Sequence, residues 1–326
     1  MTDRRVVVVG YDAAELLDIA CVTSTFAGAN RLGADPPYQV RLATPGGRPI
    51  TCDSGLVLAA QETLERVRGP IDTLVVSGGT GHECSAADER LVGHVRRLAR
   101  ESRRVASLCT GATVLAAAGL LDGRRATTHW HYAARLAAQF PQVVVDPAPI
   151  FIRDGVVATA AGVTSALDLT LSLIEEDHGA ELARWVARVL VTYLQRPGNQ
   201  AQMSMFTAAP APRTSLVRST VDHVAGNLDA DLTTNTLGRR LSVSARHLTR
   251  LFVTDIGQTP GQFVRATRVA AAAQLLSSTT LPVAAVAKRC GFGTTESLRQ
   301  AFADHYGTSP TRYRASMSRT SGRSGA

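Results

Sequence analysis

The chain has 326 residues, of which 45% are hydrophobic, 19% charged and 5% aromatic, a length that predicts about two domains with separate cores. No run of about 18 apolar residues occurs, so no membrane-spanning helix is expected, and the short apolar run near the start lacks the pattern of a signal peptide. The cysteines are odd in number and scattered (Cys21, Cys52, Cys84, Cys109 and Cys290), which argues against a disulfide framework or zinc site and fits a reducing cytoplasm.

The excess positive charge lies in one part of the chain. Residues 1–213 contain 21 Lys and Arg against 21 Asp and Glu, whereas residues 214–326 contain 14 against 6, which accounts for the whole net charge of +8. A neutral domain joined to a basic one predicts that the basic part meets a polyanion. The alternative is a basic surface that only meets solvent, and the sequence motifs must distinguish these two interpretations.

The first 195 residues alternate between strand and helix patterns. Continuous apolar runs predict buried strands at Val6–Gly10, Tyr38–Ala43, Thr73–Ser77 and Val105–Cys109. Strands buried on both faces are typical of parallel sheets covered by helices, so an α/β sandwich is expected. An Asp154-Gly155 turn predicts a hairpin within residues 142–160, and two helices, about Gly162–His178 and Ala180–Leu194, follow.

The most informative feature of this part is a cysteine between a strand and a helix. Cys109 ends a buried strand and the small-residue helix Ala112–Ala118 begins at once, an arrangement that exposes a nucleophile at a sheet edge. The positive end of the helix is expected to lower the pKa of the thiol. The glycine turn within Thr73–Gly81 offers N–H groups for an oxyanion or ligand, and Asp18 can reach the same cleft. An ordinary strand-to-helix turn is the alternative.

The middle of the chain breaks this pattern. Residues 196–213 are rich in Pro, Gly and Ala without periodicity, which predicts an exposed linker. A purely helical pattern then extends to the end of the second predicted domain, residues 214–315. The Ser, Arg and Gly residues of 316–326 predict a disordered tail.

The basic part contains an internal repeat of about fifty residues, in which Leu232–Phe252 matches Leu281–Phe302. Each copy reads as a short helix, a tight turn and a second helix. Ser244 is a good N-cap for the second helix of the first copy, and Gly291 suits the turn of the second copy. This is the helix-turn-helix pattern, in which the second helix lies in the major groove of DNA.

Periodicity sorts the side chains of the two second helices into buried and outward positions. The residues predicted to contact DNA are Ser244, Arg246, Thr249, Arg250, Thr295, Glu296, Arg299 and Gln300. Arg suits guanine, Gln suits adenine and Glu suits cytosine, although a solvated polar face is the alternative. A connecting helix from Pro260 to about Leu276, roughly 26 Å long, would let the two helices enter successive major grooves about 34 Å apart.

Residues 214–315 resemble the DNA-binding domain of AraC/XylS-type regulators. The stretches that carry the resemblance are Ser244–Phe252, Leu281–Ala287, Cys290–Gly293 and Ser309–Arg314. The resemblance implies that each domain engages two adjacent grooves of double-stranded promoter DNA, commonly within a homodimer. It implies activation of transcription by RNA polymerase more often than repression.

Residues 4–190 resemble the ThiJ/PfpI superfamily, which has a flavodoxin-like α/β fold of the class I glutamine amidotransferase type and includes isocyanide hydratases and the ligand domains of GlxA-type regulators. The stretches that carry this resemblance are Glu15–Asp18, Ser77–Gly79, Cys109–Gly111 and Gly119–Trp130. By position, Cys109 would be a nucleophile, Asp18 its acid/base partner and Thr110 an assisting hydroxyl. PfpI-type proteases carry His where Thr110 stands, so a protease triad is not expected, and His129 is predicted to be a packed histidine.

Two functions therefore compete. The favoured one is a transcription regulator without enzymatic activity, whose N-terminal domain dimerises and binds a small metabolite, nitrogen-containing by analogy with GlxA-type relatives. Its effector pocket would be formed by Asp18, Gly78, Gly79, Cys109 and Thr110. The alternative is a cysteine enzyme, such as an isocyanide hydratase-like lyase, in which Cys109, Asp18 and Thr110 act and the DNA-binding module is accessory. Neither predicts a metal ion or other cofactor.

Overall fold

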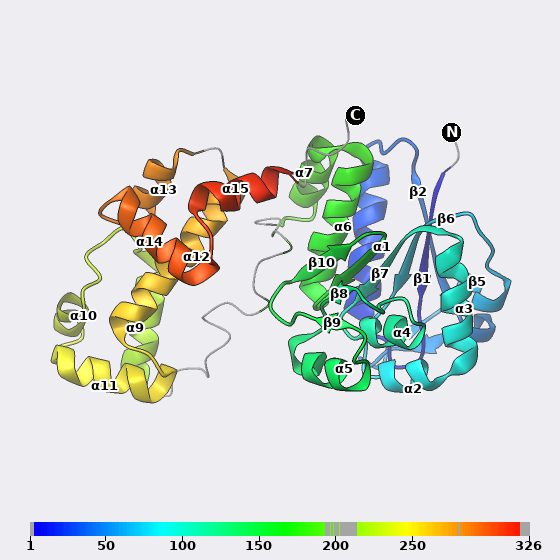
Figure 1. Ribbon diagram of the computed structural model, residues 1–326, viewed down its shortest axis with the longest axis horizontal. Coiled ribbons are helices and arrows are strands. Elements are labelled where there is room, and N and C mark those ends of the chain that lie inside the picture. The colour runs from blue at the N-terminus through cyan, green and yellow to red at the C-terminus, as the bar shows by residue number, and fades with distance from the viewer. Residues whose placement is uncertain are drawn as a thin grey trace. The chain divides into compact units, whose positions relative to one another are not determined.

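The computed structural model describes residues 3–192, 196, 198, 202, 214–279 and 281–319. The chain divides into two compact units, Met1–Gln202 and Met203–Ala326, which are described separately (Figure 1). Most of the predicted linker and residues 320–326 of the predicted tail lie outside the described residues. None of the helices in the described part combines the length and hydrophobicity needed to cross a bilayer.

The first unit is built on a seven-stranded sheet with the order β10–β11–β7–β6–β1–β2–β5, in which every neighbouring pair is parallel except β10 and β11. Its strands are β1 (Arg4–Val9), β2 (Tyr38–Thr44), β5 (Glu62–Thr63), β6 (Ile71–Val76), β7 (Ser102–Leu108), β10 (Phe151–Asp154) and β11 (Val157–Ala160). The predicted hairpin is the pair β10–β11, which turns at Asp154-Gly155. The central strands are buried on both faces, as continuous apolar runs require; Val6 to Val9 are fully covered.

Helices cover both faces of this sheet (Figure 1). They are α1 (Leu16–Arg31), α2 (His82–Ala87), α3 (Glu89–Arg100), α4 (Gly111–Ala117), α5 (Ala133–Gln139), α6 (Val163–His178) and α7 (Ala180–Val189). Helices α1, α6 and α7 pack on one another, and α2, α3 and α4 form a second group. The predicted flavodoxin-like α/β sandwich is therefore confirmed.

Short elements complete the first unit and were not predicted. They are two pairs of two-residue strands, β3 (Ile50–Thr51) with β4 (Val57–Leu58) and β8 (Arg125–Ala126) with β9 (Val144–Val145), and the 3-10 turns η1 (Pro45–Gly47), η2 (Leu64–Arg66) and η3 (Trp130–Tyr132). Elements of two or three residues are too short to leave a periodic pattern. The predicted helix over Ala180–Leu194 is also shorter: α7 ends at Val189, and Val191 has a left-handed backbone with φ 53°.

The second unit is helical. Its helices are α9 (Ser215–Gly226), α10 (Thr234–Arg240), α11 (Ala245–Ile256), α12 (Pro260–Ser278), α13 (Val283–Arg289), α14 (Thr295–Tyr306) and α15 (Pro310–Arg319). Two separate apolar cores form, one around Leu248 and Phe252 and the other around Leu298 and Phe302. Helix α12 contributes side chains to both cores and thereby joins the two halves.

The two halves repeat the predicted helix-turn-helix. In each, the residue after the first helix's C-cap has a left-handed backbone: Ser242 with φ 56° and Gly291 with φ 72°. The next residue closes the turn in the same way, because Val243 N donates to Gly238 O and Phe292 N donates to Ala287 O, both at 2.9 Å. The chain therefore changes direction identically in both copies before α11 and α14 begin.

The predicted boundaries of the two domains differ from the observed contacts at two places. Arg196 and Gln202, placed in the linker by their composition, are hydrogen-bonded to the first unit: Arg196 N and Nε donate to Asp168, and Gln202 N donates to Ala148 O. Helix α15 continues to Arg319, so residues 316–319 are helical rather than part of a tail. Composition alone did not reveal these bonded partners.

Candidate functional site

The carboxyl ends of β1, β6 and β7 meet at one edge of the sheet, where parallel α/β sheets usually place their sites. Gly78, just after β6, lies at the centre. Its N–H donates to Asp18 Oδ2 at 3.0 Å, and a Cβ atom on it would stand 2.7 Å from that oxygen and 2.5 Å from Cys109 Cβ. Only glycine fits between these groups, so the sequence-predicted pair Asp18 and Cys109 is brought together as expected.

Gly79 and Thr110 form the second contact of this edge. The Thr110 hydroxyl donates to Gly79 O at 2.8 Å and accepts from Gly79 N at 2.9 Å. The glycine N–H groups that were expected to be open for an oxyanion are therefore already paired, Gly78 with Asp18 and Gly79 with Thr110. The Thr110 hydroxyl is hydrogen-bonded to the Gly79 backbone, and its role as an assisting hydroxyl stays a prediction.

Cys109 lies at a strained turn. Its backbone is left-handed, with φ 48°, its side chain is buried, and its carbonyl accepts from Thr128 Oγ1 at 2.8 Å. Burial, and then the charge of the Asp18 carboxylate, raise the pKa of the thiol to about 12, although hydrogen bonds from Thr110 act in the opposite direction. The expectation that this pKa is lowered is therefore wrong, because burial and the nearby carboxylate both favour the protonated thiol.

Asp18 is also shielded from water. The side chain is fully covered, and burial raises its pKa to about 7, although the Gly78 N–H opposes this shift. Among the described residues its Oδ1 atom has no hydrogen-bond partner. Tyr11 lies beside the pair and donates to Ser77 O at 2.7 Å. The edge thus holds a thiol and a carboxyl group whose pKa values are both raised above their ordinary range.

A ring cluster follows Thr128 in the chain. His129 caps η3 by accepting from His131 N at 3.3 Å, and its ring lies near the Trp130 and Tyr132 rings, with centroid distances of 5.6 and 5.9 Å. Burial, and then the charge of His131, lower the pKa of His129, which keeps its ring neutral. His129 is therefore packed, as predicted, whereas Trp130 is 48% exposed.

Gln202 holds this loop from the other end of the first unit. Its Nε2 donates to Thr128 O at 2.8 Å and to Thr127 Oγ1 at 3.0 Å, and its Oε1 accepts from Trp130 N at 2.9 Å. Thr128 in turn holds the Cys109 carbonyl. One side chain at the end of the first unit is therefore two hydrogen bonds away from Cys109.

In the second unit, α11 presents the first set of predicted DNA contacts. Arg246 and Arg250 are exposed and lie four residues apart on one helix face. Arg250 Nη2 lies 3.0 Å from His247 Nδ1. Ser244 is the N-cap, and its Oγ accepts from His247 N at 3.2 Å, while the half-buried Thr249 donates to Ala245 O. The arginines are free of carboxylate partners among the described residues.

Helix α14 presents the second set. Glu296, Arg299 and Gln300 are exposed, whereas Thr295 is half-buried. Arg299 Nη1 lies 3.4 Å from Glu296 Oε2, and Gln300 Nε2 donates to Asp304 Oδ1 at 2.8 Å. Both donors therefore have an exposed partner within the same helix. Exposed pairs of this kind contribute little stability and exchange readily for a DNA partner.

Sequence reasoning missed three residues of the first site: Tyr11, Thr128 and Gln202. Each acts through a contact with the backbone of a distant residue. Tyr11 follows β1 directly, and this position at a carboxyl end was the one signal that could have identified it.

Comparison with known proteins identifies both units. Residues 4–176 match the model of the DJ-1/PfpI family, and residues 237–316 match that of a helix-turn-helix domain. The chain is 33% identical over 288 residues to the HTH-type transcriptional regulator CdhR of Pseudomonas aeruginosa, which covers 88% of this chain and 84% of that protein. The chain belongs to the AraC-type transcriptional regulators with a DJ-1/PfpI domain.

Other relatives agree with this assignment. The HTH-type transcriptional regulator GlxA of Rhizobium meliloti is 31% identical over 302 residues, 90% of each chain. The solved structure of an AraC family transcriptional regulator from Pseudomonas putida has a TM-score of 0.50 and 27% identity, and covers 57% of this chain and 99% of its own. The isonitrile hydratase of Pseudomonas putida, 37% identical, matches only 48% of this chain and 66% of that enzyme. The protein is a DNA-binding transcriptional regulator, as the resemblance of residues 214–315 implied.

The burial of Cys109 predicts its reactivity. At pH 7.5, iodoacetamide is expected to alkylate Cys109 about 100-fold more slowly than the exposed Cys84, because the buried thiol stays protonated. Peptide mass mapping over a time course measures both rates. Asp18→Asn is expected to speed alkylation of Cys109, because it removes a neighbouring negative charge. Alkylation of Cys109 as fast as that of Cys84 would show that the thiol is activated after all.

Proposed function

We propose that the regulator reads promoter DNA with α11 and α14. The proposed contacts are Ser244, Arg246, Thr249, Arg250, Thr295, Glu296, Arg299 and Gln300. The observation that carries this proposal is the exposure of arginines on the second helix of two identically closed helix-turn-helix copies. The net charge of +8, all of which lies in residues 214–326, supports contact with the phosphate backbone.

The geometry of the second unit suits two adjacent major grooves. Helix α12 has 19 residues and is therefore about 28 Å long. Its two ends pack under different cores, one carrying α11 and the other α14. With the width of the flanking helices added, the separation approaches the roughly 34 Å between successive major grooves. Each chain of the regulator would thus cover two grooves.

This assignment is tested with a duplex selected from a random library by the full-length protein. Arg250→Ala and Arg299→Ala are each expected to weaken specific binding by about 1–3 kcal/mol, because each removes a base contact. Arg90→Ala, which removes an exposed arginine from α3 of the first unit, is the control and should bind as the wild type does. Unchanged binding in both α11 and α14 variants, measured by gel shift at fixed salt, would refute the proposal.

We further propose that the first unit binds a small nitrogen-containing effector at the edge formed by Asp18, Gly78, Gly79, Cys109 and Thr110. The unpartnered Oδ1 atom of Asp18 supports a polar ligand, because a buried polar atom is costly without a hydrogen bond. The exposed Trp130 ring beside the same loop suits a cationic ligand. Because the edge is closed, entry requires the loop of Thr127 to Trp130 to move.

The structure favours binding over turnover at this edge. A cysteine nucleophile acts as its thiolate, and burial keeps the Cys109 thiol neutral. The Thr110 hydroxyl both donates to and accepts from the Gly79 backbone. We therefore infer that Cys109 belongs to the floor of an effector pocket and that the protein is not an enzyme. The partial match to isonitrile hydratase supports the shared architecture of the first unit.

Control by an effector requires that the ligand bind two states of the protein differently. Gln202 supports a route for this, because it holds the loop that bonds to Cys109 and stands at the end of the first unit. A ligand that displaces the loop would release Gln202. We propose that this release, within a homodimer in the cytoplasm, changes how the regulator engages promoter DNA and RNA polymerase, with activation as the outcome.

The Gln202 contacts can be tested without the effector. Gln202→Ala is expected to raise amide hydrogen exchange at Trp130 and its neighbours at least severalfold, because the Trp130 N–H loses its acceptor and the loop loses its donor bonds. Gln142→Ala, an exposed glutamine of the same unit, is the matched control. If exchange in the loop is the same in both variants, Gln202 does not hold the loop in solution.

A further inference from the structure

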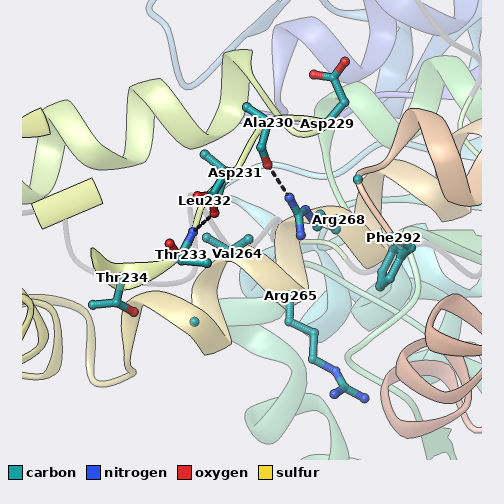
Figure 2. Close-up of a pocket in the computed structure, with 12 residues that line it drawn as sticks. Asp229, Ala230, Asp231, Leu232, Thr233, Thr234, Val264, Arg265, Arg268 and Phe292 are labelled. Atoms are coloured by element: carbon teal, nitrogen blue, oxygen red, sulfur yellow. Dashed lines mark hydrogen bonds between the residues drawn. The ribbon is translucent and has the colours of Figure 1, made fainter. Parts of the chain in front are cut away.

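Arg268 occupies the place where α12 passes from one core to the other. Phe263 and Val264, before it, pack in the core of the first helix-turn-helix half, and Val269, after it, packs in the core of the second. Its half-buried guanidinium donates from Nε to Leu228 O at 2.9 Å. It also donates from Nη2 to Ala230 O at 2.8 Å, which Figure 2 shows. The side chain of the connecting helix thus holds the α9–α10 connection of the first half.

The same connection touches the turn of the second half. A Cβ atom on Gly291 would stand 2.0 Å from Leu228 O and 2.7 Å from Arg268 Nε and Nη2. The Leu228 carbonyl is a backbone group, so it could make room for a Cβ atom only if the whole α9–α10 connection shifted. Gly291 therefore permits a direct contact between the two halves, and Arg268 fixes the carbonyl that makes it.

The repeat within the chain shows whether the second turn needs glycine because of this contact or because of its left-handed backbone. Ser242 stands at the matching position of the first turn, with φ 56° against 72° for Gly291, and it is exposed. A side chain is thus accommodated at this left-handed position where no neighbour approaches. Glycine is required in the second turn because Leu228 O lies against it, and the left-handed backbone alone does not require it.

The contact lies beside an open part of the junction. A cavity of about 650 Å³ lies beside it, lined from the first half by Asp229 and Asp231, from α12 by Arg265 and Arg268, and from the second half by Phe292 (Figure 2). Side chains do not fill this space. Among the described residues, the angle between the halves therefore depends on α12, on the exposed ion pair of Arg265 with Asp304 of α14, and on the contact of Leu228 O with Arg268 and Gly291.

Each DNA-reading helix is fixed to its own core: α11 by Leu248 and Phe252, and α14 by Leu298 and Phe302. The angle between the cores consequently sets the angle between the helices. We infer that Arg268 and Gly291 determine the spacing specificity of this regulator, the number of base pairs it accepts between the two half-sites. This inference rests on the proposed reading of DNA by α11 and α14.

The test uses the full-length protein and a duplex that it selects from a random library. One base pair is then inserted between the two half-sites, which moves them by about 3.4 Å and rotates them by about 36°. Wild-type protein is expected to bind the inserted duplex about tenfold more weakly. For Arg268→Met and Gly291→Ser, the ratio of the two affinities is expected to fall below about threefold. Because the readout is the ratio of two affinities of the same variant, the loss of one positive charge weakens both affinities alike and cancels.

Ser242→Gly is the matched control, since it exchanges the same pair of residues at the equivalent turn, and it should keep the wild-type ratio. Thermal unfolding checks that each variant is folded; if Gly291→Ser does not fold, Arg268→Met decides alone. Folded Arg268→Met protein with the wild-type ratio overturns the inference. A wild-type protein that ignores the insertion instead refutes the two-groove reading on which the inference rests.

Discussion

The turn between the paired helices is the constraint on which the DNA-binding unit depends. In both copies, one residue with a left-handed backbone and one backbone hydrogen bond, to Gly238 O or Ala287 O, fix the entry of the second helix. The second helix then buries its apolar face and leaves its arginines in solvent. The same local geometry therefore produces two helices that each expose arginine side chains. What differs between the copies is how each turn meets the rest of the unit.

The first unit is organised by a comparable close approach. Because Gly78 has no side chain, the carboxyl group of Asp18 and the thiol of Cys109 can pack against the end of the same strand. That packing also removes both groups from water, which raises both pKa values and favours their neutral forms. The same enclosure therefore disfavours the thiolate form of Cys109.

The sequence predicted the elements whose environment follows from local pattern. The buried runs that became β1, β6 and β7 and the repeated helix-turn-helix both have periods that a few residues reveal. It could not predict the direction of the Cys109 pKa, because the helix end is visible in the sequence and the surrounding burial is not. Gln202 was hidden in a segment rich in Pro and Gly, and the partner of Arg268, Leu228, lies forty residues away. Contacts of this kind join distant backbone atoms and leave no periodic signal.

The central claim is that one chain reads two successive major grooves. Protection of guanine N7 from dimethyl sulfate measures this most directly, because that atom faces the major groove. On a duplex selected by the full-length protein, the account predicts two groups of protected guanines for each bound chain, separated by about one helical turn of 10–10.5 base pairs. A single protected group of guanines for each chain, or no protection of guanine N7, would contradict it.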